Sequence, residues 1–178
     1  MYYLGQACGI ISAIVTVVMP LFKKKEQILI CAILVNGLNA LNFAFIGQLG
    51  SSVYLCLVAI VQSLISIYHL RKNTDISMAE TILFLVLYLG FGFYGMISAE
   101  GFVWAINSKN LLELLPIVGA LMLMISVFAK GEQKTRLFIM FNGSAWAVYS
   151  AIVGSTVFFT ASIAVLSNAF AMWKYRKR

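Results

Sequence analysis

The sequence predicts an all-α polytopic membrane protein with seven transmembrane helices, and its composition, its apolar runs and its charge distribution each predict this fold. Of the 178 residues, 62% are hydrophobic and 11% are charged, whereas soluble domains are about 45–50% apolar and about 25% charged. A chain of this length cannot bury so much apolar surface beneath a water-facing shell. We therefore expect a single membrane domain, residues 1–178, surrounded by the lipid bilayer.

Seven apolar runs lie between the charged segments, and each approaches the roughly 20 residues that a membrane span needs. The runs are Tyr3–Phe22, Ile28–Gly47, Ser51–Leu70, Ile76–Ser98, Asn110–Ala129, Leu137–Val153 and Thr156–Trp173. A segment in lipid must satisfy its own backbone hydrogen bonds, so each run is predicted to be a helix. The opening MYYLGQACG lacks the basic segment of a cleavable signal, so the first run is expected to stay as a span.

The basic residues predict an orientation. Twelve of the thirteen lysine and arginine residues fall on one side of the predicted bundle, and only Lys109 falls on the other. The twelve are Lys23, Lys24, Lys25, Arg71, Lys72, Lys130, Lys134, Arg136, Lys174, Arg176, Lys177 and Arg178. Basic loops collect in the cytoplasm, which predicts an external N-terminus and a cytoplasmic C-terminus. The same asymmetry accounts for the net charge of +7, so no nucleic-acid partner is expected.

The chain matches itself at an offset of 106 residues. KKKEQILICAILVNG (Lys23–Gly37) lies over AKGEQKTRLFIMFNG (Ala129–Gly143), with E-Q and N-G pairs in the same places. Two junctions between an inner loop and a helix could look alike by chance, but the identical pairs favour a duplication. The repeat gives a first triple-helix unit (1–72), a linker helix (73–99) and a second triple-helix unit (110–178), related as parallel repeats.

The second half carries residues by which the chain resembles a known family. They are ELLPIVG (Glu113–Gly119), Arg136 with Met140, Trp146, Tyr149 followed by Gly154-Ser155, and Leu166 with Asn168 before Trp173. With them the chain resembles the bacterial inner-membrane proteins of the YgjV type, and its 3+1+3 arrangement resembles the SWEET sugar transporters and the wider PQ-loop superfamily. The resemblance implies a location in the bacterial inner (plasma) membrane. SWEETs carry helix prolines that serve as hinges, and here only Pro20 could correspond.

Amides and hydroxyls gather in the second, third, sixth and seventh runs. Because burying them is costly unless they are paired, they should face the bundle interior, where they either bond helix to helix or line a polar pocket. Amides recognise hydroxyl groups, and an aromatic face covers the apolar side of a sugar-like ring. The SWEET resemblance implies an aromatic residue on the sixth helix and an amide on the seventh. The predicted substrate-binding residues are Asn39, Asn42, Gln62, Ser63, Trp146, Tyr149 and Asn168.

Glu113 is the only acid well inside a predicted run. A carboxylate within the membrane is by default a functional residue. The alternative is an interfacial acid that stabilises the N-terminus of its helix, where Pro116 would fit the first turn. Both interpretations stay open at this point. The repeat aligns Glu113 with Ala7, so its role is expected in one half only.

No catalytic or metal-binding pattern is evident. Cys8, Cys31 and Cys56 lie in apolar runs without C-x-x-C spacing, which is typical of small core residues. GFGFYG (Gly90–Gly95) lies inside an apolar run and follows no strand, so it fails the context of a dinucleotide motif. We expect no metal, no cofactor and no enzymatic activity.

The function predicted from the sequence is transport of a small polar solute, with a sugar as the first candidate, by alternating access between the two units. Facilitated diffusion is favoured over proton coupling because no acid lies at the centre of the polar set. The alternative is a receptor, scaffold or assembly factor whose polar residues only hold helices together. A cavity among the second, third, sixth and seventh helices would favour transport, and a core with every amide paired would favour the scaffold. The sequence leaves open whether the protein forms a homo-oligomer.

Overall fold

The computed structural model describes residues 1–19, 22, 25–98, 108–128 and 132–174, and the regular secondary structure of these residues is helical. The helices are α1 (Tyr2–Val18), α2 (Lys25–Phe45), α3 (Ser51–Lys72), α4 (Met78–Ser98), α5 (Ser108–Phe128), α6 (Glu132–Ile152) and α7 (Val157–Lys174). The predicted all-α fold with seven helices is confirmed for this part of the chain.

Most helix boundaries lie within a few residues of the predicted runs, and the larger differences have a physical cause. α6 begins at Glu132 rather than Leu137, and α2 begins at Lys25 rather than Ile28. Charged residues can occupy a first helical turn that projects from the lipid, and an acid such as Glu26 is favoured there by the helix dipole. Hydropathy alone therefore starts these helices too late. Pro20, the candidate hinge, lies outside the described residues.

Four helices, α2, α3, α4 and α7, are long and apolar enough to cross a membrane. Two further helices, α1 and the Leu111–Ser126 part of α5, are apolar but shorter. The described chain is thus a helical protein with several candidate spans. Crossing by all seven helices, and the direction in which they cross, stay predictions.

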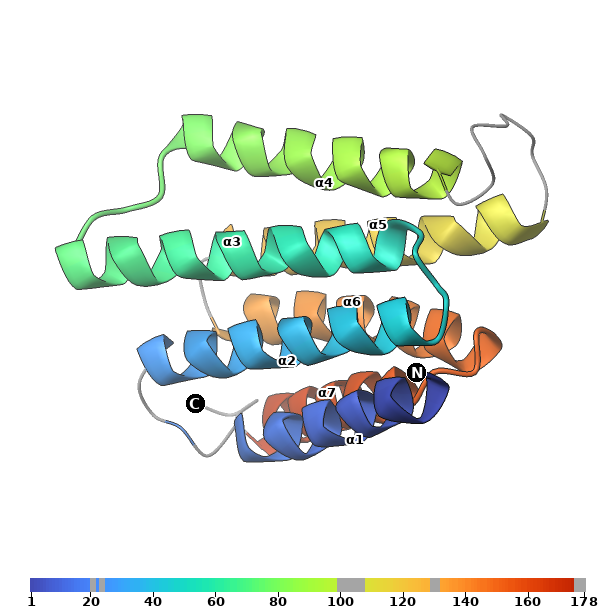
Figure 1. Ribbon diagram of the computed structural model, residues 1–178. Coiled ribbons are helices and arrows are strands. Elements are labelled where there is room, and N and C mark those ends of the chain that lie inside the picture. Colours follow the sequence, from blue (N-terminus) through green and yellow to red (C-terminus); the bar gives the residue numbers. More distant parts are fainter. Residues whose placement is uncertain (20–21, 23–24, 99–107, 129–131, 175–178) are drawn as a thin grey trace.

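The helices run side by side in two columns (Figure 1). One column holds α1, α2 and α3, and the other holds α7, α6 and α5, so that α1 contacts α7 and α3 contacts α5. α4 lies on top of the stack and packs against α3 and α5. We call the end where α1, α3, α5 and α7 begin the N-terminal end. We call the opposite end the basic end, because it carries Arg71, Lys72, Lys134, Arg136 and Lys174.

In α2, α6 and α7, side chains are more deeply buried near the N-terminal end than near the basic end. In α7, Val157, Thr160 and Ala161 are buried, whereas every described residue after them is at least partly exposed. In α6, every described side chain before Gly143 is at least partly exposed. In α2, Cys31 is the only buried residue among the described side chains before Asn39. The middle pair of the stack, α2 and α6, is therefore buried mainly near the N-terminal end.

Two apolar clusters hold the N-terminal end and the α4 side together. Phe43, Tyr149 and Val157 form one cluster, which joins α2, α6 and α7 near the N-terminal end. The other cluster joins α3, α4 and α5 through Leu55, Val58, Phe84, Tyr88, Ile117, Ala120 and Met124. Fully burying a large apolar side chain contributes about 1.5–3 kcal/mol, so these clusters stabilise the packing of α2 near α6 and of α3 against α5.

Candidate functional site

Glu113 is the centre of a buried polar contact between α5, α3 and α6. Its side chain is 9% exposed. The backbone N–H of Ser51 donates to Glu113 Oε2 at 2.9 Å, and the Ser51 hydroxyl donates to the same oxygen at 2.5 Å. The Tyr149 hydroxyl donates to Glu113 Oε1 at 2.8 Å and lies 3.4 Å from the Ser52 hydroxyl. An O–H···O distance of about 2.5–2.7 Å is typical of a charged acceptor.

Two glycines allow the helices to approach closely enough for this contact. Gly50 precedes α3, and a Cβ added to it would lie 2.7 Å from Glu113 Oε2. Gly95 of α4 packs on the backbone of Ser51, where an added Cβ would lie 2.6 Å from the Ser51 nitrogen. The carboxylate thereby meets the N-terminus of α3, whose unpaired N–H groups and dipole favour a negative charge. We call these bonds between Ser51 and Glu113 the α3–α5 contact.

A second contact at the same end joins α1 to the start of α7. The backbone N–H of Thr156 donates to Gln6 Oε1 at 2.9 Å, and the Thr156 hydroxyl donates to the Gln6 carbonyl at 2.8 Å. Gln6 Nε2 in turn donates to the Gly154 carbonyl at 2.8 Å. We call these bonds between Gln6 and Thr156 the α1–α7 contact.

The two contacts have the same plan and differ in charge. In each contact, the side chain of Glu113 or Gln6 accepts a hydrogen bond from the backbone N–H of a serine or threonine at the start of another helix. The hydroxyl of that serine or threonine lies within 3.2 Å of the backbone carbonyl oxygen of the same Glu113 or Gln6. Glu113 therefore occupies the place in one contact that Gln6 occupies in the other. The sequence repeat instead pairs Glu113 with Ala7, the residue after Gln6. The reason is that the offset of 106 residues is set by identities in α2 and α6 and is then applied unchanged to α1 and α5.

The aromatic residues predicted for the pocket lie together, next to Glu113. The rings of Trp146 and Tyr149 meet edge to face with centroids 6.1 Å apart, and Phe43 of α2 lies 5.6 Å from Trp146 and 5.7 Å from Tyr149. Tyr149 is completely buried, whereas Trp146 is partly exposed. Gly119 of α5 makes room for the indole, since an added Cβ would lie 3.0 Å from it. These rings connect α2 to α6 next to the Glu113 contact, on the side that faces the basic end.

The predicted asparagines of α2 are paired to other helices at the N-terminal end. Ser12 donates to Asn39 Oδ1 at 2.6 Å. Asn42 donates to the Gly5 carbonyl at 2.7 Å and accepts from the Ser155 hydroxyl at 2.5 Å. Both amides therefore hold α2 against α1, and Asn42 also holds it against the turn before α7.

The other predicted polar residues make different contacts. Gln62 accepts a hydrogen bond from the Tyr88 hydroxyl of α4 at 2.6 Å, on the side of α3 that faces α4. Ser63 donates to the Ala59 carbonyl and Asn168 to the Ala164 carbonyl, each within its own helix. The structure thus brings Trp146 and Tyr149 together, and it places Gln62 in a separate contact. Ser63 and Asn168 stay predicted pocket residues.

Two buried amide atoms in the middle of the bundle have no hydrogen-bond partner among the described residues. They are Gln62 Nε2, a donor, and Asn142 Oδ1, an acceptor. Asn36, which the repeat aligns with Asn142, donates to the Ala32 carbonyl of its own helix at 2.8 Å. Unpaired buried polar atoms are uncommon and call for a reason. Asn142 is the unpaired group on the face of α6 that continues from the aromatic cluster toward the basic end.

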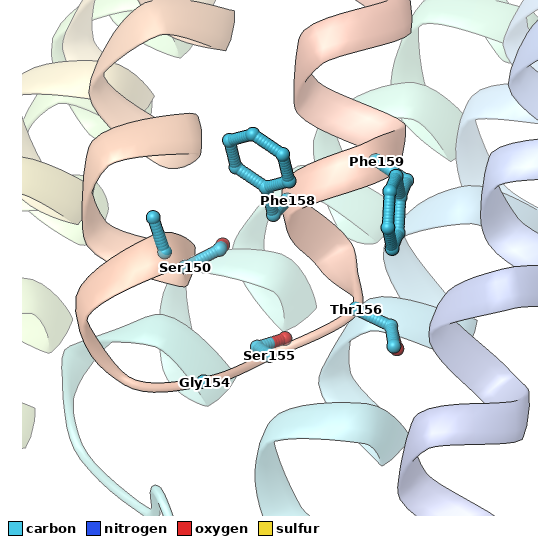
Figure 2. Close-up of a pocket in the computed structure, with 7 residues that line it drawn as sticks. Ser150, Gly154, Ser155, Thr156, Phe158 and Phe159 are labelled. Carbon is cyan, nitrogen blue, oxygen red and sulfur yellow. The ribbon is translucent and has the colours of Figure 1, made fainter.

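A surface pocket of about 370 Å³ lies at the turn between α6 and α7 (Figure 2). Its lining is formed by Ser150, Ala151, Gly154, Ser155, Thr156, Phe158 and Phe159. The Ser150 hydroxyl is buried and has no partner among the described residues. The pocket contains none of the predicted substrate-binding residues, and its turn includes Gly154 at φ = 70°, a conformation that glycine adopts readily.

The family model for a bacterial inner membrane protein, Imp-YgjV, matches residues 3–178. The chain belongs to this family. Membership of the Imp-YgjV family covers nearly the whole chain, and it confirms the resemblance that the residues from Glu113 onward carry. It also places the protein in the bacterial inner membrane as a multi-pass protein. No curated protein and no solved structure matches the chain.

Sequence reasoning on this Imp-YgjV chain singled out Glu113 and Tyr149 but missed the residues that complete their contact. These residues are Ser51 and Ser52 at the start of α3, and sequence reasoning also missed the matching contact of Gln6 in α1 with Thr156 just before α7. No spacing pattern distinguishes any of the four. One available signal is that Gln6 is the only amide in α1. A second is that Ser51 and Thr156 each stand at a helix start, where a free N–H needs a partner.

Proposed function

We propose that this protein transports a small polar solute across the inner membrane by alternating access between two triple-helix units, α1–α3 and α5–α7. A sugar is the first candidate for the solute. The single observation that carries the proposal is the contrast between the ends of the bundle. Bonds between the two units close the N-terminal end, whereas the side chains of α2, α6 and α7 are more exposed toward the basic end.

The equivalence of the two units is supported by the order of the helices. In the two columns, half a turn about an axis between α2 and α6 would bring α1, α2 and α3 onto α5, α6 and α7 (Figure 1). The contact of α3 with α5 then corresponds to the contact of α1 with α7. Phe43 and Tyr149, which the offset of 106 residues pairs, touch each other. A residue that touches its own equivalent lies close to such an axis.

Closure of the N-terminal end is supported by hydrogen bonds that cross between the units. The α3–α5 contact and the α1–α7 contact both do so, and Ser155 of the second unit donates to Asn42 of the first. Opening this end requires all three to break. At the basic end, Asn36 and Asn168 bond within their own helices, so the units can separate there without breaking those bonds.

We place the site for a solute between α2, α6 and α7, on the side of the aromatic cluster that faces the basic end. Trp146 is partly exposed and offers a ring face, and the unpaired Asn142 Oδ1 offers an acceptor. The amides of Asn36 and Asn168 are partly exposed as well. An aromatic ring with amides nearby is the chemistry that binds the apolar face and the hydroxyl groups of a sugar.

A second candidate function is a non-transporting scaffold or receptor, and one observation favours it. Asn39, Asn42 and Gln62, three of the predicted pocket residues, are bonded to neighbouring helices, as interhelical polar residues in any membrane bundle can be. Transport is the stronger proposal, because a scaffold gives no reason why α2 and α6 are buried mainly near one end and why Asn142 Oδ1 is buried without a partner among the described residues.

Uptake by proteoliposomes tests the proposal. Purified protein is reconstituted and assayed against a panel of radiolabelled sugars, vitamins and amino acids, with protein-free liposomes as the blank. Trp146→Ala should lower uptake about tenfold or more, because one lost ring contact of about 1.4 kcal/mol gives a factor of ten. The matched control is Trp173→Ala, since Trp173 is 74% exposed near the end of α7. Transport is rejected if no solute exceeds the blank, and the pocket is rejected if both variants keep full uptake.

A further inference from the structure

Glu113 differs in one respect from its counterpart at the same end of the bundle. Gln6 makes the equivalent contact with a neutral amide, and it leaves no part of that contact unbonded. An amide is therefore sufficient to hold a helix start at this end. The carboxylate in the α3–α5 contact differs from an amide because it carries a charge, accepts hydrogen bonds at both oxygens and can bind and release a proton.

The partners of Glu113 among the described residues stabilise its ionised form. Three donors reach it, namely the Ser51 N–H, the Ser51 hydroxyl and the Tyr149 hydroxyl, and all three are neutral. Hydrogen bonds to a charged acceptor are roughly twice as strong as neutral ones. The N-terminus of α3 adds the favourable end of its dipole. Neutralising the carboxylate therefore weakens every bond in the α3–α5 contact.

The contact also has a place for the proton. A proton on Oε2 would meet the Ser51 N–H, which can only donate, so Oε1 is the oxygen that can take it. There it faces the Tyr149 hydroxyl, which can accept the new O–H and turn its own hydrogen toward Ser52, 3.4 Å away. The Tyr149 ring belongs to the cluster with Trp146 and Phe43. A change at Glu113 is thereby transmitted to the proposed solute site.

Few other ionisable groups face this position. Tyr149 comes from α6, and Cys56 lies one turn beyond Ser52 on α3. From α4 the neighbour is Gly95, which carries no side chain. Lys109 lies one turn earlier on α5, and its side chain is outside the described residues. Because thiols and phenols keep their protons at neutral and acidic pH, Glu113 is the described group here whose charge can change.

We propose that Glu113 is a proton-binding site, and that its protonation releases the α3–α5 contact, which is one of the three contacts that must break before the N-terminal end can open. The proton comes from water on that side, forms an O–H bond at Oε1, and returns to water when the contact re-forms and the carboxylate ionises. The state with fewer donors around Glu113 is the one that binds the proton better, so a proton shifts the population toward it. The inference deepens the proposed transport function by adding proton coupling, whereas the sequence favours facilitated diffusion.

Distances between spin labels test this inference without any solute. Labels at Leu49→Cys and Leu111→Cys, positions 61% and 64% exposed, flank the α3–α5 contact. Labels at Tyr3→Cys and Ile152→Cys flank the α1–α7 contact as the matched control. The background replaces Cys8, Cys31 and Cys56 by Ala, and the full chain is held in lipid nanodiscs. Acidification from about pH 8 to about pH 3 carries an ordinary glutamate side chain, with a pKa of about 4.3, through its protonation.

We expect acid to raise the long-distance population of the 49–111 pair about threefold or more, with no change in the 3–152 pair. Glu113→Gln should abolish the response, Glu113→Asp should retain it, and Gln6→Glu should give the 3–152 pair a response of its own. The inference is overturned if the wild-type 49–111 distances are the same at both pH values, or if Glu113→Gln responds as the wild type does. Because no solute is present, these outcomes do not depend on whether the uptake assay detects transport.

Should Glu113→Gln fail to fold, infrared spectroscopy of the wild type decides the matter. Protonation of a buried carboxyl adds a C=O band separate from those of exposed acids, and Glu113 is the buried acid among the described residues. A band that appears on acidification, and that Glu113→Asp shifts, supports the site. No such band down to about pH 3 would overturn it, because a glutamate side chain in water takes up its proton near about pH 4.3, well above that value.

Discussion

The two ends of the bundle are built from the same helices but use their polar residues differently. At the N-terminal end, side chains from six helices bond to other helices, as in the pairs Ser51–Glu113, Gln6–Thr156 and Ser12–Asn39. Toward the basic end, Asn36, Ser63 and Asn168 bond to the turn before them in the same helix. A polar residue in a membrane bundle can therefore either fix a neighbour or leave the neighbour free to move.

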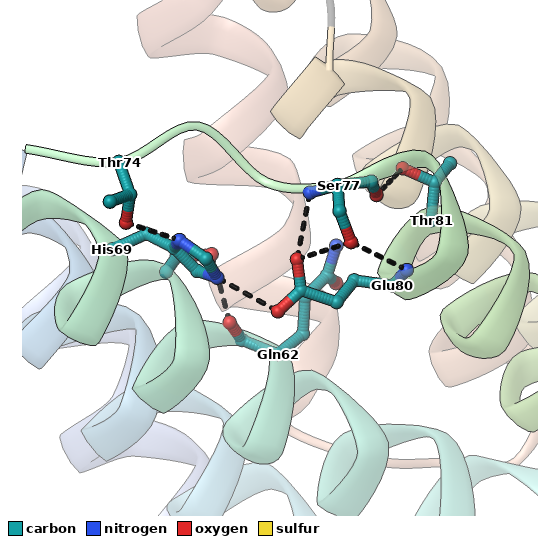
Figure 3. Close-up of polar contacts among 7 residues, drawn as sticks. Gln62, His69, Thr74, Ser77, Glu80 and Thr81 are labelled. Carbon is teal, nitrogen blue, oxygen red and sulfur yellow. Dashed lines mark hydrogen bonds and ion pairs between the residues drawn. The ribbon is translucent and has the colours of Figure 1, made fainter.

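The basic end has polar contacts as well, and two of them join neighbouring helices of one column or the linker helix. Arg71 at the end of α3 donates to Glu26 at the start of α2 at 2.8 Å. His69 lies between Thr74 and Glu80, at 2.7 Å and 2.8 Å, and so ties the end of α3 to the start of α4 (Figure 3). Surface ion pairs contribute little, about 0–1 kcal/mol. These bonds join α2 to α3 and α3 to α4, and neither of them crosses between the two units.

The largest expected effect concerns the side of the membrane that each end faces, because that outcome is all or none. A reporter fused after Arg178 should read cytoplasmic, and one inserted near Gly101 should read external, since twelve basic residues lie on one side and one on the other. Both sites lie outside the described residues. Phosphatase and fluorescent-protein fusions make the measurement. Finding both reporters on one side would remove the seven-span topology.

Packing at the N-terminal end should tolerate no added volume. Gly9 of α1 faces Thr156, and an added Cβ would lie 2.1 Å from the threonine hydroxyl oxygen. Gly9→Ala should therefore destabilise the protein by about 1–3 kcal/mol, the usual cost of overpacking. The matched control is Gly37→Ala in α2, where the nearest atom would be Ile60 at 4.0 Å. Thermal unfolding of both proteins in one detergent makes the comparison, and equal midpoints would contradict it.

A smaller effect separates a bond between helices from a bond within one. Tyr149→Phe removes a donor from the buried Glu113 carboxylate and should cost about 1–3 kcal/mol of stability. Asn168→Ala removes a bond to its own helix and should change stability by no more than about 0.5 kcal/mol. The same thermal unfolding assay applies. A larger loss for Asn168→Ala than for Tyr149→Phe would mean that the basic end, and not the N-terminal end, holds the units together.

Hydropathy and charge predicted the number, type and approximate ends of the helices, because every segment in lipid must satisfy its own backbone hydrogen bonds within an apolar run. The starts of α2 and α6 were predicted a few residues after their observed positions at Lys25 and Glu132. Hydropathy does not detect a first helical turn that is made of charged residues. Of the candidate site, the sequence indicated Glu113, Tyr149 and Trp146 by their residue types. Their partners depend on which helices meet, and no local pattern records that.

The equivalence of Glu113 and Gln6 illustrates the same limit. A repeat alignment with one fixed offset pairs Glu113 with Ala7, because the sequence identity that sets the offset lies in the second helix of each unit. The hydrogen bonds, in contrast, pair Glu113 with Gln6 through Ser51 and Thr156. A shift of one residue rotates a helix face by about a quarter turn, so contacts, and not identity, define the equivalent position.

The central claim is that the bundle is closed at the N-terminal end and accessible from the basic end, and the reach of a membrane-impermeant maleimide tests it most directly. Single cysteines at Asn36 and Asn142 are made without the native Cys8, Cys31 and Cys56, with exposed Leu49→Cys as the control for the N-terminal side. In oriented vesicles, reagent on the basic side should label positions 36 and 142, and reagent on the opposite side should label position 49 alone. Labelling of positions 36 and 142 from the N-terminal side, or from neither side, would contradict the account.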